Sequence, residues 1–599
     1  TMLTGRMDIT GALAAGSATM NLRGTDIVAG NGGASLVSAI PGALRMQSGR
    51  YFGTFNVPAG SHLEFSEGPA GPQPKFFGDG SVLNNEGHIA WLGGGAIQAD
   101  GYGHPNLVIN NNGSGLFQIA ANGSVFTRAQ FRDGFPQLNN AVGAIVRKTV
   151  AGDSLFDTFR LDNSGQVVND AGTLTFNTIA FARHGSSHAG AGTQRFTAGQ
   201  LWTEGTVTFA APFSITGGET VGPGSGFASL ATTGKGLLNW GGGRFSGRFA
   251  LTSGSRMLID DGGSPTATEK DLSDGSVFDN YGVITWTGAG AIQAGGYGFQ
   301  PNPVFNNKPT GVFNAMPSGG ILNRESYRDG TPLFNNEGSV NVGAAPTVLR
   351  LEGWNFAQTS TGRIDVKLGG TGTSPRAFDQ VQVTGFASLA GSIGVHLMGD
   401  YMPVPGSTFA VMTYGGRSGS FTPVQSLGDF ATYQYNANNL TLVAKDYPKQ
   451  NDAWEQYYFG STSSPNGDPL ADPDGDGIPN LLERALGQNP NNGGTSSLGV
   501  GGIAALDGKS ASLEVQENGV RYLAFAYTRP SGAAALTDIT YSGERANSLP
   551  TAAWSPADVV QYSVTPGPGE SRETVIMRST QPINGAAREF LRLSVSLNQ

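Results

Sequence analysis

The amino-acid sequence predicts an all-β fold built mainly from a parallel β-solenoid, and three observations predict it. Glycine occurs 92 times in 599 residues and charged residues make up only 14%, while 38% are hydrophobic. This composition favours many short strands joined by glycine turns over a disordered chain. The second and third observations are a long internal repeat and a short motif that recurs within it.

The long repeat has a period of about 195 residues. Residues 95–99 (GAIQA) return as residues 290–294, an offset of 195, and residues 42–61 return in related form as residues 236–255, an offset of 194. Self-similarity at a fixed long period is typical of stacked repeat architectures. We therefore expect one continuous solenoid that is duplicated along its length.

The short motif is an apolar residue followed closely by Asn. Its successive spacings are 26, 29 and 23 residues in the first copy and 27 and 29 in the second, which suits one solenoid coil of two or three strands. Asn tolerates a left-handed backbone at a corner, and Asn amides of stacked coils can form a ladder. Asn pairs in surface loops of separate sandwiches are the alternative, but the regular spacing favours the solenoid. The motif begins at Leu83, Ile109, Leu138, Leu161, Phe278, Phe305 and Phe334.

The sequence pattern changes from about residue 379. Residues 379–395, 401–406, 409–413 and 419–421 resemble the closing coils of bacterial autotransporter-like passenger domains. The resemblance covers roughly residues 350–445 and implies a right-handed parallel β-helix that is capped near Ala444. The predicted domains are thus a β-helix over 1–445, a helical connector over 446–495 and a small β-sandwich over 496–599.

Short elements are expected after the solenoid. Residues 451–459 read as a helix capped by Asn451 and ended by Gly460, and residues 480–486 as a second helix stopped by Gly487. Alternating apolar residues then predict strands, as expected of a sandwich. These strands lie at 521–527, 573–577 and 590–595.

The sharpest motif is DPDGDGIPNLLE at residues 472–483, which fits the calcium-loop pattern D-x-[DN]-x-[DN]-G-x₅-E at every position. Ca²⁺ takes six to eight oxygen ligands, and alternate carboxylates on a turning loop supply them. The glycine at position six permits the sharp turn. The predicted ligands are Asp472, Asp474, Asp476, the carbonyl of Ile478, Asn480 through water, and Glu483 as a bidentate ligand.

This loop resembles the thrombospondin type 3 and dockerin-like loops of secreted bacterial proteins. Pro473 and Pro479 distinguish it from a paired EF-hand. The resemblance implies a structural calcium ion and an extracellular or cell-surface location, where calcium is always available. The alternative is an acidic turn in a solvated linker.

Charge and composition argue against several classes of partner. The net charge of −9 includes no basic block, so nucleic acid and anionic membrane are not expected as partners. The absence of cysteine excludes disulfides, thiolate zinc sites and cysteine nucleophiles. The sequence has no apolar run of about 18 residues, so we expect no helix that spans a membrane.

Catalytic constellations are weak, and we predict that the protein is not an enzyme. His88 and His104 align with Val283 and Phe299 in the second copy, so the repeat does not preserve them. His184 and His188 have helical spacing, but glycines surround them and a metal site is not expected there.

Other polar and aromatic pairs recur in both copies. Arg132-Asp133 and Arg328-Asp329 repeat as an Arg-Asp-Gly turn, which favours a structural role over catalysis. Trp91 and Trp286 are expected in the core. Tyr102 and Tyr297 between glycines fit either the core or a sugar-binding surface.

We therefore expect an extracellular structural or adhesive protein, a fibre or adhesin that self-associates. Residues 16–20 match residues 205–209, so the first coil begins partway through a repeat and is expected to be an open edge that pairs with another copy in a head-to-tail filament. The runner-up is a β-helix that binds or cleaves polysaccharide. A third reading assigns binding to the calcium-dependent C-terminal region, with the solenoid as a spacer.

Overall fold

The structure is a computed structural model with 58% strand and 4% helix, which confirms the all-β class. By compactness the chain divides into two units. The first comprises residues 1–364, 381–391 and 414–420, and the second comprises residues 365–380, 392–413 and 421–599. The described residues are 2–101, 106–128, 135–295, 301–316, 321–324, 330–343, 345–374, 376–398, 401, 403–423, 431–445, 450–492, 510–531, 535–549, 553–566, 572–583 and 588–598.

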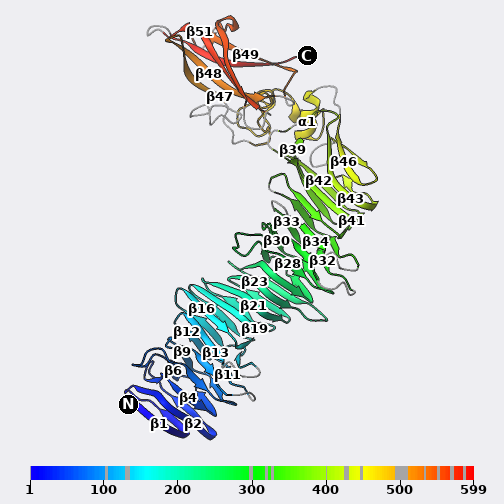
Figure 1. Cartoon of the computed structure of the whole chain (residues 1–599). Helices are drawn as coiled ribbons and strands as arrows, with labels where there is room; N and C mark the ends of the chain where they lie inside the picture. Colours follow the sequence, from blue (N-terminus) through cyan, green and yellow to red (C-terminus); the bar gives the residue numbers. More distant parts are fainter. Residues whose placement is uncertain are drawn as a thin grey trace. The chain divides into compact units, whose positions relative to one another are not determined.

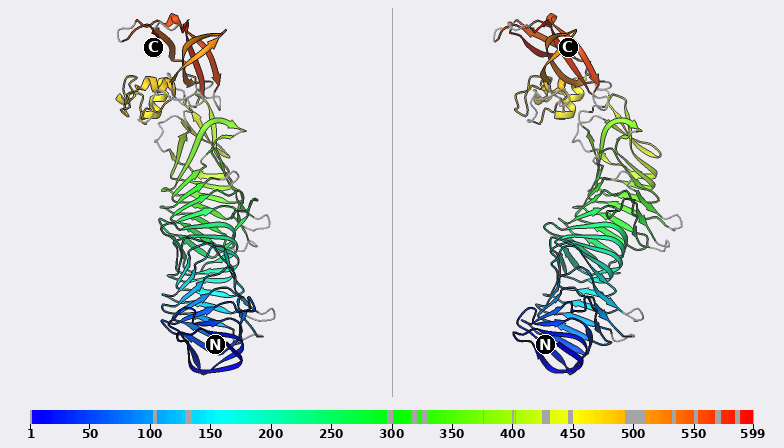
Figure 2. Two further views of the ribbon diagram at one scale, coloured as in Figure 1. Left: turned by 90° about the vertical axis from the view of Figure 1, so that its left-hand side faces the viewer. Right: turned by 60° about the vertical axis from the view of Figure 1, so that its left-hand side comes forward.

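The predicted solenoid is confirmed as a parallel β-solenoid of about 14 turns (Figures 1 and 2). Each strand pairs in parallel with the strands one coil before and one coil after it, which produces three stacks of strands. The register reproduces the motif spacing: Leu83 lies opposite Ile109, and Ile109 lies opposite Leu138. In the second copy Phe305 lies opposite Phe278 on one side and Phe334 on the other.

The stacks are defined by their strand pairings. The first stack contains β5 (Thr54–Val57), β8 (Val82–Asn85), β11 (Val108–Asn111), β14 (Gln137–Asn140), β17 (Arg160–Asn163), β28 (Lys270–Leu272), β31 (Ile292–Ala294), β34 (Ile321–Arg324) and β37 (Val348–Leu351). The second stack contains β3 (Leu44–Met46), β6 (His62–Phe65), β9 (His88–Trp91), β12 (Leu116–Ile119), β15 (Ile145–Lys148), β18 (Gln166–Asn169), β20 (Ser187–Ala189), β22 (Thr206–Phe209), β24 (Ala228–Thr232), β26 (Arg248–Leu251), β29 (Val277–Asn280), β32 (Val304–Asn307), β35 (Leu333–Asn336) and β38 (Asn355–Gln358). The third stack contains β4 (Gly49–Phe52), β7 (Lys75–Phe77), β10 (Ile97–Ala99), β13 (Gly123–Arg128), β16 (Asp153–Asp157), β27 (Arg256–Ile259), β30 (Val283–Trp286), β33 (Val312–Ala315) and β36 (Ser339–Val342). Longer strands bend from one stack into another: β1 (Met2–Ala14), β2 (Met20–Val37), β19 (Thr173–Ala182), β21 (Thr193–Thr203), β23 (Pro212–Val221) and β25 (Leu237–Ser246).

The long repeat does not correspond to a whole number of coils. Strands β8 and β29 are equivalent in the two copies, yet β8 belongs to the first stack and β29 to the second. The coils between them are shorter, since Phe176 lies opposite Phe196 and Phe196 lies opposite Ile215. Equivalent residues of the two copies therefore lie on different faces of the solenoid.

Stacked Asn residues form the predicted ladders. In the first copy Asn85 donates to Asn111 Oδ1 at 2.7 Å, Asn111 to Asn140 at 2.8 Å, and Asn140 to Asn163 at 2.8 Å. These amides are buried, and the first three each donate a further hydrogen bond to a backbone carbonyl of the next coil. The second copy repeats the ladder through Asn280, Asn307, Asn336 and Gln358.

The expected left-handed backbone at these Asn residues was wrong. Only Thr158 and Asn518 have positive φ among the described residues other than glycine. The Asn pairs instead end extended strands, because an extended backbone keeps each side chain in register with the next coil. A second, outer ladder runs beside the buried one, with Asn84, Asn110 and Asn139 each donating to the preceding coil at 2.8 Å.

Aromatic stacks fill the solenoid core. Phe278 and Phe305 have ring centroids 5.4 Å apart, and Phe305 and Phe334 have centroids 5.3 Å apart, with nearly parallel planes in both pairs. Trp91 and Trp286 are buried, as predicted. Their in-register burial holds successive coils together through dispersion and the hydrophobic effect.

Antiparallel pairs appear after the coils. Strand β39 (Arg363–Thr373) pairs antiparallel with β40 (Arg376–Phe378), and β46 (Asn439–Ala444) lies antiparallel to β43 (Thr408–Gly419) and β45 (Ala431–Tyr435). The remaining strands here are β41 (Gln380–Leu389), β42 (Ser392–Leu397) and β44 (Thr422–Pro423).

Both predicted helices form. α1 (Gln450–Phe459) is followed by Gly460, but Asn451 lies inside it and donates to Glu455 instead of capping the helix. α2 (Asn480–Leu486) ends at Gly487, whose left-handed backbone (φ 71°) suits glycine. Among the described residues, no helix has the length and apolar character needed to cross a membrane.

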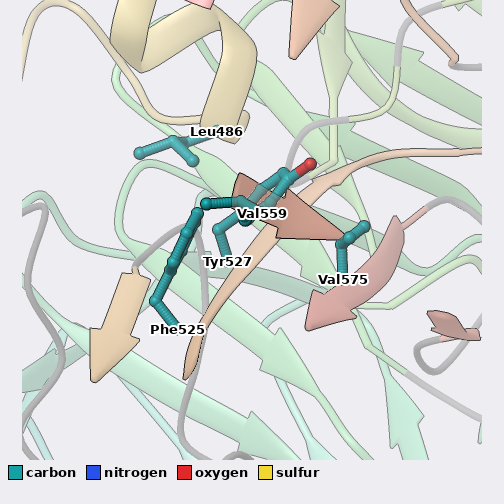
Figure 3. Packing of buried hydrophobic residues seen from close by; sticks show 5 residues of the cluster. All are labelled: Leu486, Phe525, Tyr527, Val559 and Val575. Carbon is teal, nitrogen blue, oxygen red and sulfur yellow. The ribbon is translucent and has the colours of Figure 1, made fainter. Parts of the chain in front are cut away.

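The C-terminal region contains two antiparallel sheets. One has the order β47-β48-β51-β50 and the other pairs β49 with β52. The four-stranded sheet contributes Phe525, Tyr527, Val559 and Val575 to an apolar cluster, and α2 contributes Leu486 (Figure 3). Partly buried Tyr541, Leu591 and Leu593 of the other sheet pack against it. The strands are β47 (Ser510–Glu517), β48 (Val520–Pro530), β49 (Ile539–Ala546), β50 (Val559–Pro566), β51 (Arg572–Pro582) and β52 (Phe590–Leu597).

Candidate metal centre

The predicted calcium loop brings three carboxylates together. Ligand oxygens of Asp472, Asp474 and Asp476 all lie within 4.8 Å of one another. Oxygens bound to one Ca²⁺ at 2.3–2.6 Å can be up to about 5 Å apart, so this spacing fits one ion. The positive φ values of Gly475 (76°) and Gly477 (88°) allow the turn that gathers them.

Backbone donors of the loop orient the carboxylates. Asp472 accepts hydrogen bonds from the N–H groups of Gly475 and Gly477, each at 2.9 Å, and Asp476 Oδ1 accepts one from Ile478 at 2.9 Å. Asp474 Oδ1 accepts a longer one from Asp476. The other oxygens, Asp474 Oδ2 and Asp476 Oδ2, are buried without a hydrogen-bond partner among the described residues.

Glu483 of α2 is not one of the residues whose oxygens lie within 4.8 Å of one another, but its charge interacts with those of the three Asp residues. Its side chain is 0% exposed, and neither carboxylate oxygen has a hydrogen-bond partner within the described part of the chain. Burial, followed by the charges of Asp474, Asp476 and Asp472, raises the pKa of Glu483 to about 7. A buried carboxylate that is repelled by nearby negative charges is unfavourable unless a cation or a proton compensates it.

Asn480 and Ile478 serve the loop in different ways. The Asn480 amide donates to the carbonyls of Asn466 and Asp468 at 2.7 and 2.8 Å, which ties the preceding turn to α2. Its Oδ1 atom is buried without a described partner. The Ile478 side chain is buried, which anchors the position whose carbonyl is the predicted ligand.

α2 also connects the loop to the C-terminal sheets. Buried Arg484 donates two hydrogen bonds to Asp538, at 2.7 and 2.8 Å, and Tyr541 donates to the carbonyl of Ala485 at 2.8 Å. Leu486 packs in the apolar cluster described above. Adjacent residues of one short helix thus face the acidic loop and the sheets.

The residues present fit a calcium ion. The donors are all hard oxygens and the three Asp carboxylates are close enough to share an ion. Glu483 lies outside this close group, and its two oxygens have no hydrogen-bond partner among the described residues. An acidic turn in a solvated linker would expose its glutamate, whereas Glu483 is buried. When bound, Ca²⁺ would compensate the charge of the four carboxylates.

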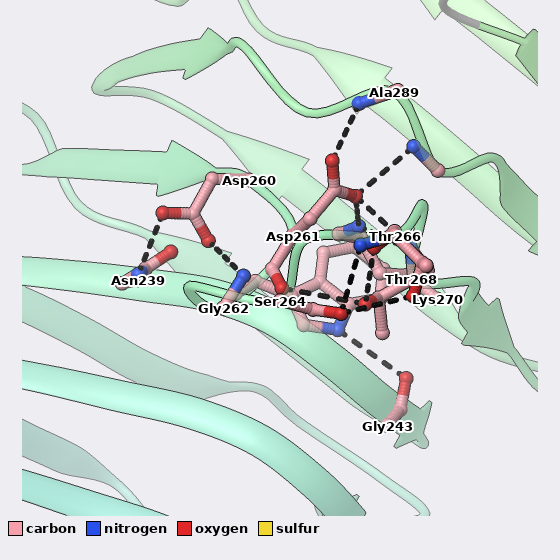
Figure 4. A network of polar contacts seen from close by, with 12 residues as sticks. Asn239, Gly243, Asp260, Asp261, Gly262, Ser264, Thr266, Thr268, Lys270 and Ala289 are labelled. Atoms are coloured by element: carbon pink, nitrogen blue, oxygen red, sulfur yellow. Dashed lines mark hydrogen bonds and ion pairs between the residues drawn. The ribbon is translucent and has the colours of Figure 1, made fainter.

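A second polar centre lies inside the solenoid, around Lys270 (Figure 4). Lys270 is fully buried and its ammonium group lies 3.3 Å from Asp261 Oδ1. Burial would raise the pKa of Asp261, but N–H donors from Thr268, Ala289 and Gly290, together with the Lys270 charge, lower it to about 2. The charges of Lys270 and Asp261 are thus compensated within the network, so we do not expect these residues to bind a ligand.

Two of the histidines discussed from the sequence, His184 and His188, have structural partners. His184 Nδ1 accepts the Thr206 N–H at 3.1 Å, and His188 is buried 2.8 Å from Gln194 Oε1 and against Phe209 and Phe213. The two therefore do not form a shared metal site. Of the residues discussed from the sequence, eight lie outside the described part of the chain: Tyr102, His104, Arg132, Asp133, Tyr297, Phe299, Arg328 and Asp329.

One exposed aromatic pair was not predicted from the sequence. The Trp202 side chain is 37% exposed and stacks on Phe181, with ring centroids 6.1 Å apart and an interplanar angle of 13°. The Arg183 guanidinium lies over Phe181 at 4.5 Å. The exposure of Trp202 could have been predicted from the alternation of inward and outward side chains along β21, because this alternation places Trp202 on the outer face.

No protein-family model matches the chain, and no curated protein matches it in sequence.

Proposed function

We propose that the chain is an extracellular or cell-surface structural protein of bacterial type, a fibre or adhesin with the solenoid as its rod. The observation that carries this proposal is that polar side chains of the solenoid bond mainly to neighbouring coils. Arg45 pairs with Glu64, Arg147 with Asp170, and Lys308 with Glu337, in each case between coils. Carboxylates used in this way serve cohesion, which favours a structural role over hydrolysis.

Self-association is the second part of the proposal. Strand β1 pairs in parallel with β2 along one edge. The opposite edge of a solenoid strand can pair with a strand of another copy. Register shifts near Gly5 and Gly11 bend this edge, so a partner strand must follow the same bends, as β2 does.

Electron microscopy and sedimentation of the whole chain at micromolar concentration with calcium test self-association. We expect filaments that shorten or disappear in Asp8→Pro, because proline removes a backbone donor from the exposed edge strand, and that persist in Asp8→Ser. Monomers only, for the unsubstituted chain, would contradict the head-to-tail filament.

The calcium loop is proposed to bind one structural Ca²⁺ through Asp472, Asp474, Asp476, the Ile478 carbonyl and Glu483, with Asn480 acting through water. The burial of Glu483, whose two oxygens have no hydrogen-bond partner among the described residues, supports this. The ion would fix α2, and through Arg484 and Leu486 the C-terminal sheets.

Binding of polysaccharide is the second candidate function, and the exposed Trp202–Phe181 stack favours it. A flat aromatic face can stack on a sugar ring, and the polar groups of Arg183, which is held by Asp162 and Glu204, and of Gln200, which accepts from the Trp202 indole, lie beside it. Glycan binding that is lost in Trp202→Ala and kept in Trp202→Phe would support this function. Equal binding in all three proteins would rule out this surface.

A further inference from the structure

Two histidines of adjacent coils face each other on the solenoid surface. His62 begins β6 and His88 begins β9, and the two residues are directly opposed in the second stack. Their Nδ1 atoms are 3.2 Å apart, and their rings meet at an angle of 68°. Both side chains are partly exposed, so solvent and ions can reach them.

A third residue fixes which nitrogen of His88 is free. His88 Nε2 lies 2.8 Å from Gln118 Oε1, while the Gln118 amide donates to Thr149 Oγ1 at 3.1 Å. Because Oε1 can only accept, His88 Nε2 carries the proton. In the neutral imidazole the Nδ1 atom then presents a lone pair toward His62.

This geometry matches two ligands of one tetrahedral metal ion. Zinc–nitrogen bonds of 2.0–2.1 Å at the tetrahedral angle place two ligand nitrogens about 3.3 Å apart. Metal-binding histidines commonly donate the other ring N–H to an acceptor, as His88 does to Gln118. We propose that His62 and His88 bind a divalent transition-metal ion, represented by Zn²⁺, through their Nδ1 atoms, with Gln118 as a positioning residue.

The remaining coordination positions are open to water, and Glu64 lies nearby as a charge but not as a third ligand. Glu64 lies two residues after His62 in the same strand, so it shares the outer face. It is held 3.0 Å from Arg45 and its charge acts on His88. The site therefore has a negative group at hand to balance part of the metal charge.

The second copy of the repeat shows that the pair is not needed for coil packing. There Arg256 lies opposite Val283 at the equivalent positions of the strands. The solenoid thus forms with either pair, and the metal site belongs to the first copy alone. The second copy also supplies the substitutions His62→Arg and His88→Val, which this fold already accommodates.

Calorimetric titration of the whole chain with Zn²⁺ at pH 7.5 tests the proposal, with millimolar Ca²⁺ present to occupy the acidic loop. We expect one zinc ion per chain, loss of that binding in His62→Arg and in His88→Val, and binding weakened roughly tenfold in Gln118→Leu. His184→Ala, which removes an exposed histidine elsewhere, should bind zinc unchanged. Unchanged melting temperatures without zinc would show that the variants fold.

Three results would overturn the site. These are no zinc binding up to 1 mM by the unsubstituted chain, zinc binding that persists in both His62→Arg and His88→Val, or zinc binding that depends on His184 instead. None of these results bears on the calcium loop or on filament formation.

Discussion

The Asn ladder of the solenoid and the acidic loop before the C-terminal sheets both bury polar side chains, but only the ladder is complete in itself. Asn111 accepts from one coil, donates to the next and donates again to a backbone carbonyl. Glu483 is equally buried, yet its two carboxylate oxygens have no hydrogen-bond partner among the described residues.

The difference follows from chemistry. An amide carries both donors and acceptors, so identical amides in register satisfy one another, whereas a carboxylate only accepts and repels its neighbours. A group of carboxylates therefore needs cations or protons from the solution to compensate its charge. The solenoid should be stable without added ions, and the region around α2 should depend on them.

Removing the Glu483 charge should give the largest effect, and its sign should change with calcium. In Glu483→Gln, calcium affinity should fall at least 100-fold, which is about 2.7 kcal/mol, because the bidentate ligand is lost. Without calcium the same variant should be more stable than the unsubstituted chain, because a buried charge has been removed.

Calcium titration and thermal unfolding with and without a chelator measure both effects. Asp452→Asn, an acidic residue of α1 outside the loop, is the matched control and should leave calcium affinity unchanged. A Glu483→Gln protein that binds calcium normally would show that Glu483 is not a ligand.

Breaking the buried ladder should cost nearly as much. Asn140→Ala leaves the Asn111 amide and the Gln166 carbonyl without their side-chain partner, so the free energy of unfolding should fall by about 2–3 kcal/mol. Asn139→Ala removes the neighbouring, partly exposed member of the outer ladder and should cost less than about 1 kcal/mol. Equal losses in chemical denaturation would mean that burial does not distinguish the two ladders.

His188 should make solenoid stability depend on pH. Burial lowers the pKa of His188 to about 4, although Gln194 opposes this, so between pH 6.5 and 4 the unfolded chain binds more protons than the folded one. Stability is therefore highest above pH 6.5 and falls as the pH drops, by about 2 kcal/mol at pH 5. His188→Gln should remove this part of the dependence, as denaturation at pH 7.5 and pH 5 would reveal.

Lys75 and Lys270, two buried lysines at equivalent positions of the repeat, should respond differently to substitution by Met, although by the smallest amounts. Lys75 donates to the carbonyls of Gly93 and Gly94, and burial lowers its pKa to about 8. Lys270 pairs with Asp261. Lys75→Met should be neutral or slightly stabilising, whereas Lys270→Met should destabilise by about 1–2 kcal/mol because Asp261 loses its counter-ion. Melting temperatures that shift alike would remove the distinction.

Periodicity made most of the fold predictable. The Asn motifs gave the coil spacing, since Leu83, Ile109 and Leu138 are in register as expected, and Gly487 marked the end of α2. The extended backbone of the Asn residues was not predictable, because a tolerance for left-handed turns does not say that the turn is used. The change of face between the two copies was also not predictable, because it depends on the lengths of coils that lack the Asn motif.

The candidate metal residues were predictable because the loop is contiguous in sequence. The burial of Glu483 and the bonds from Arg484 to Asp538 were not, because they depend on sheets that lie about 50 residues later. The pairing of His62 with His88 required the register of two coils. Comparison of the copies alone had suggested that His88 is an ordinary surface position.

Hydrogen exchange of the whole chain with and without calcium tests the central contrast most directly. Calcium should slow exchange in α2 and in β48 and β52, the strands that α2 contacts. It should leave exchange in the ladder strands β8, β11, β14 and β17 unchanged. Exchange in α2 that does not respond to calcium, or ladder strands that respond as strongly as α2, would contradict the account.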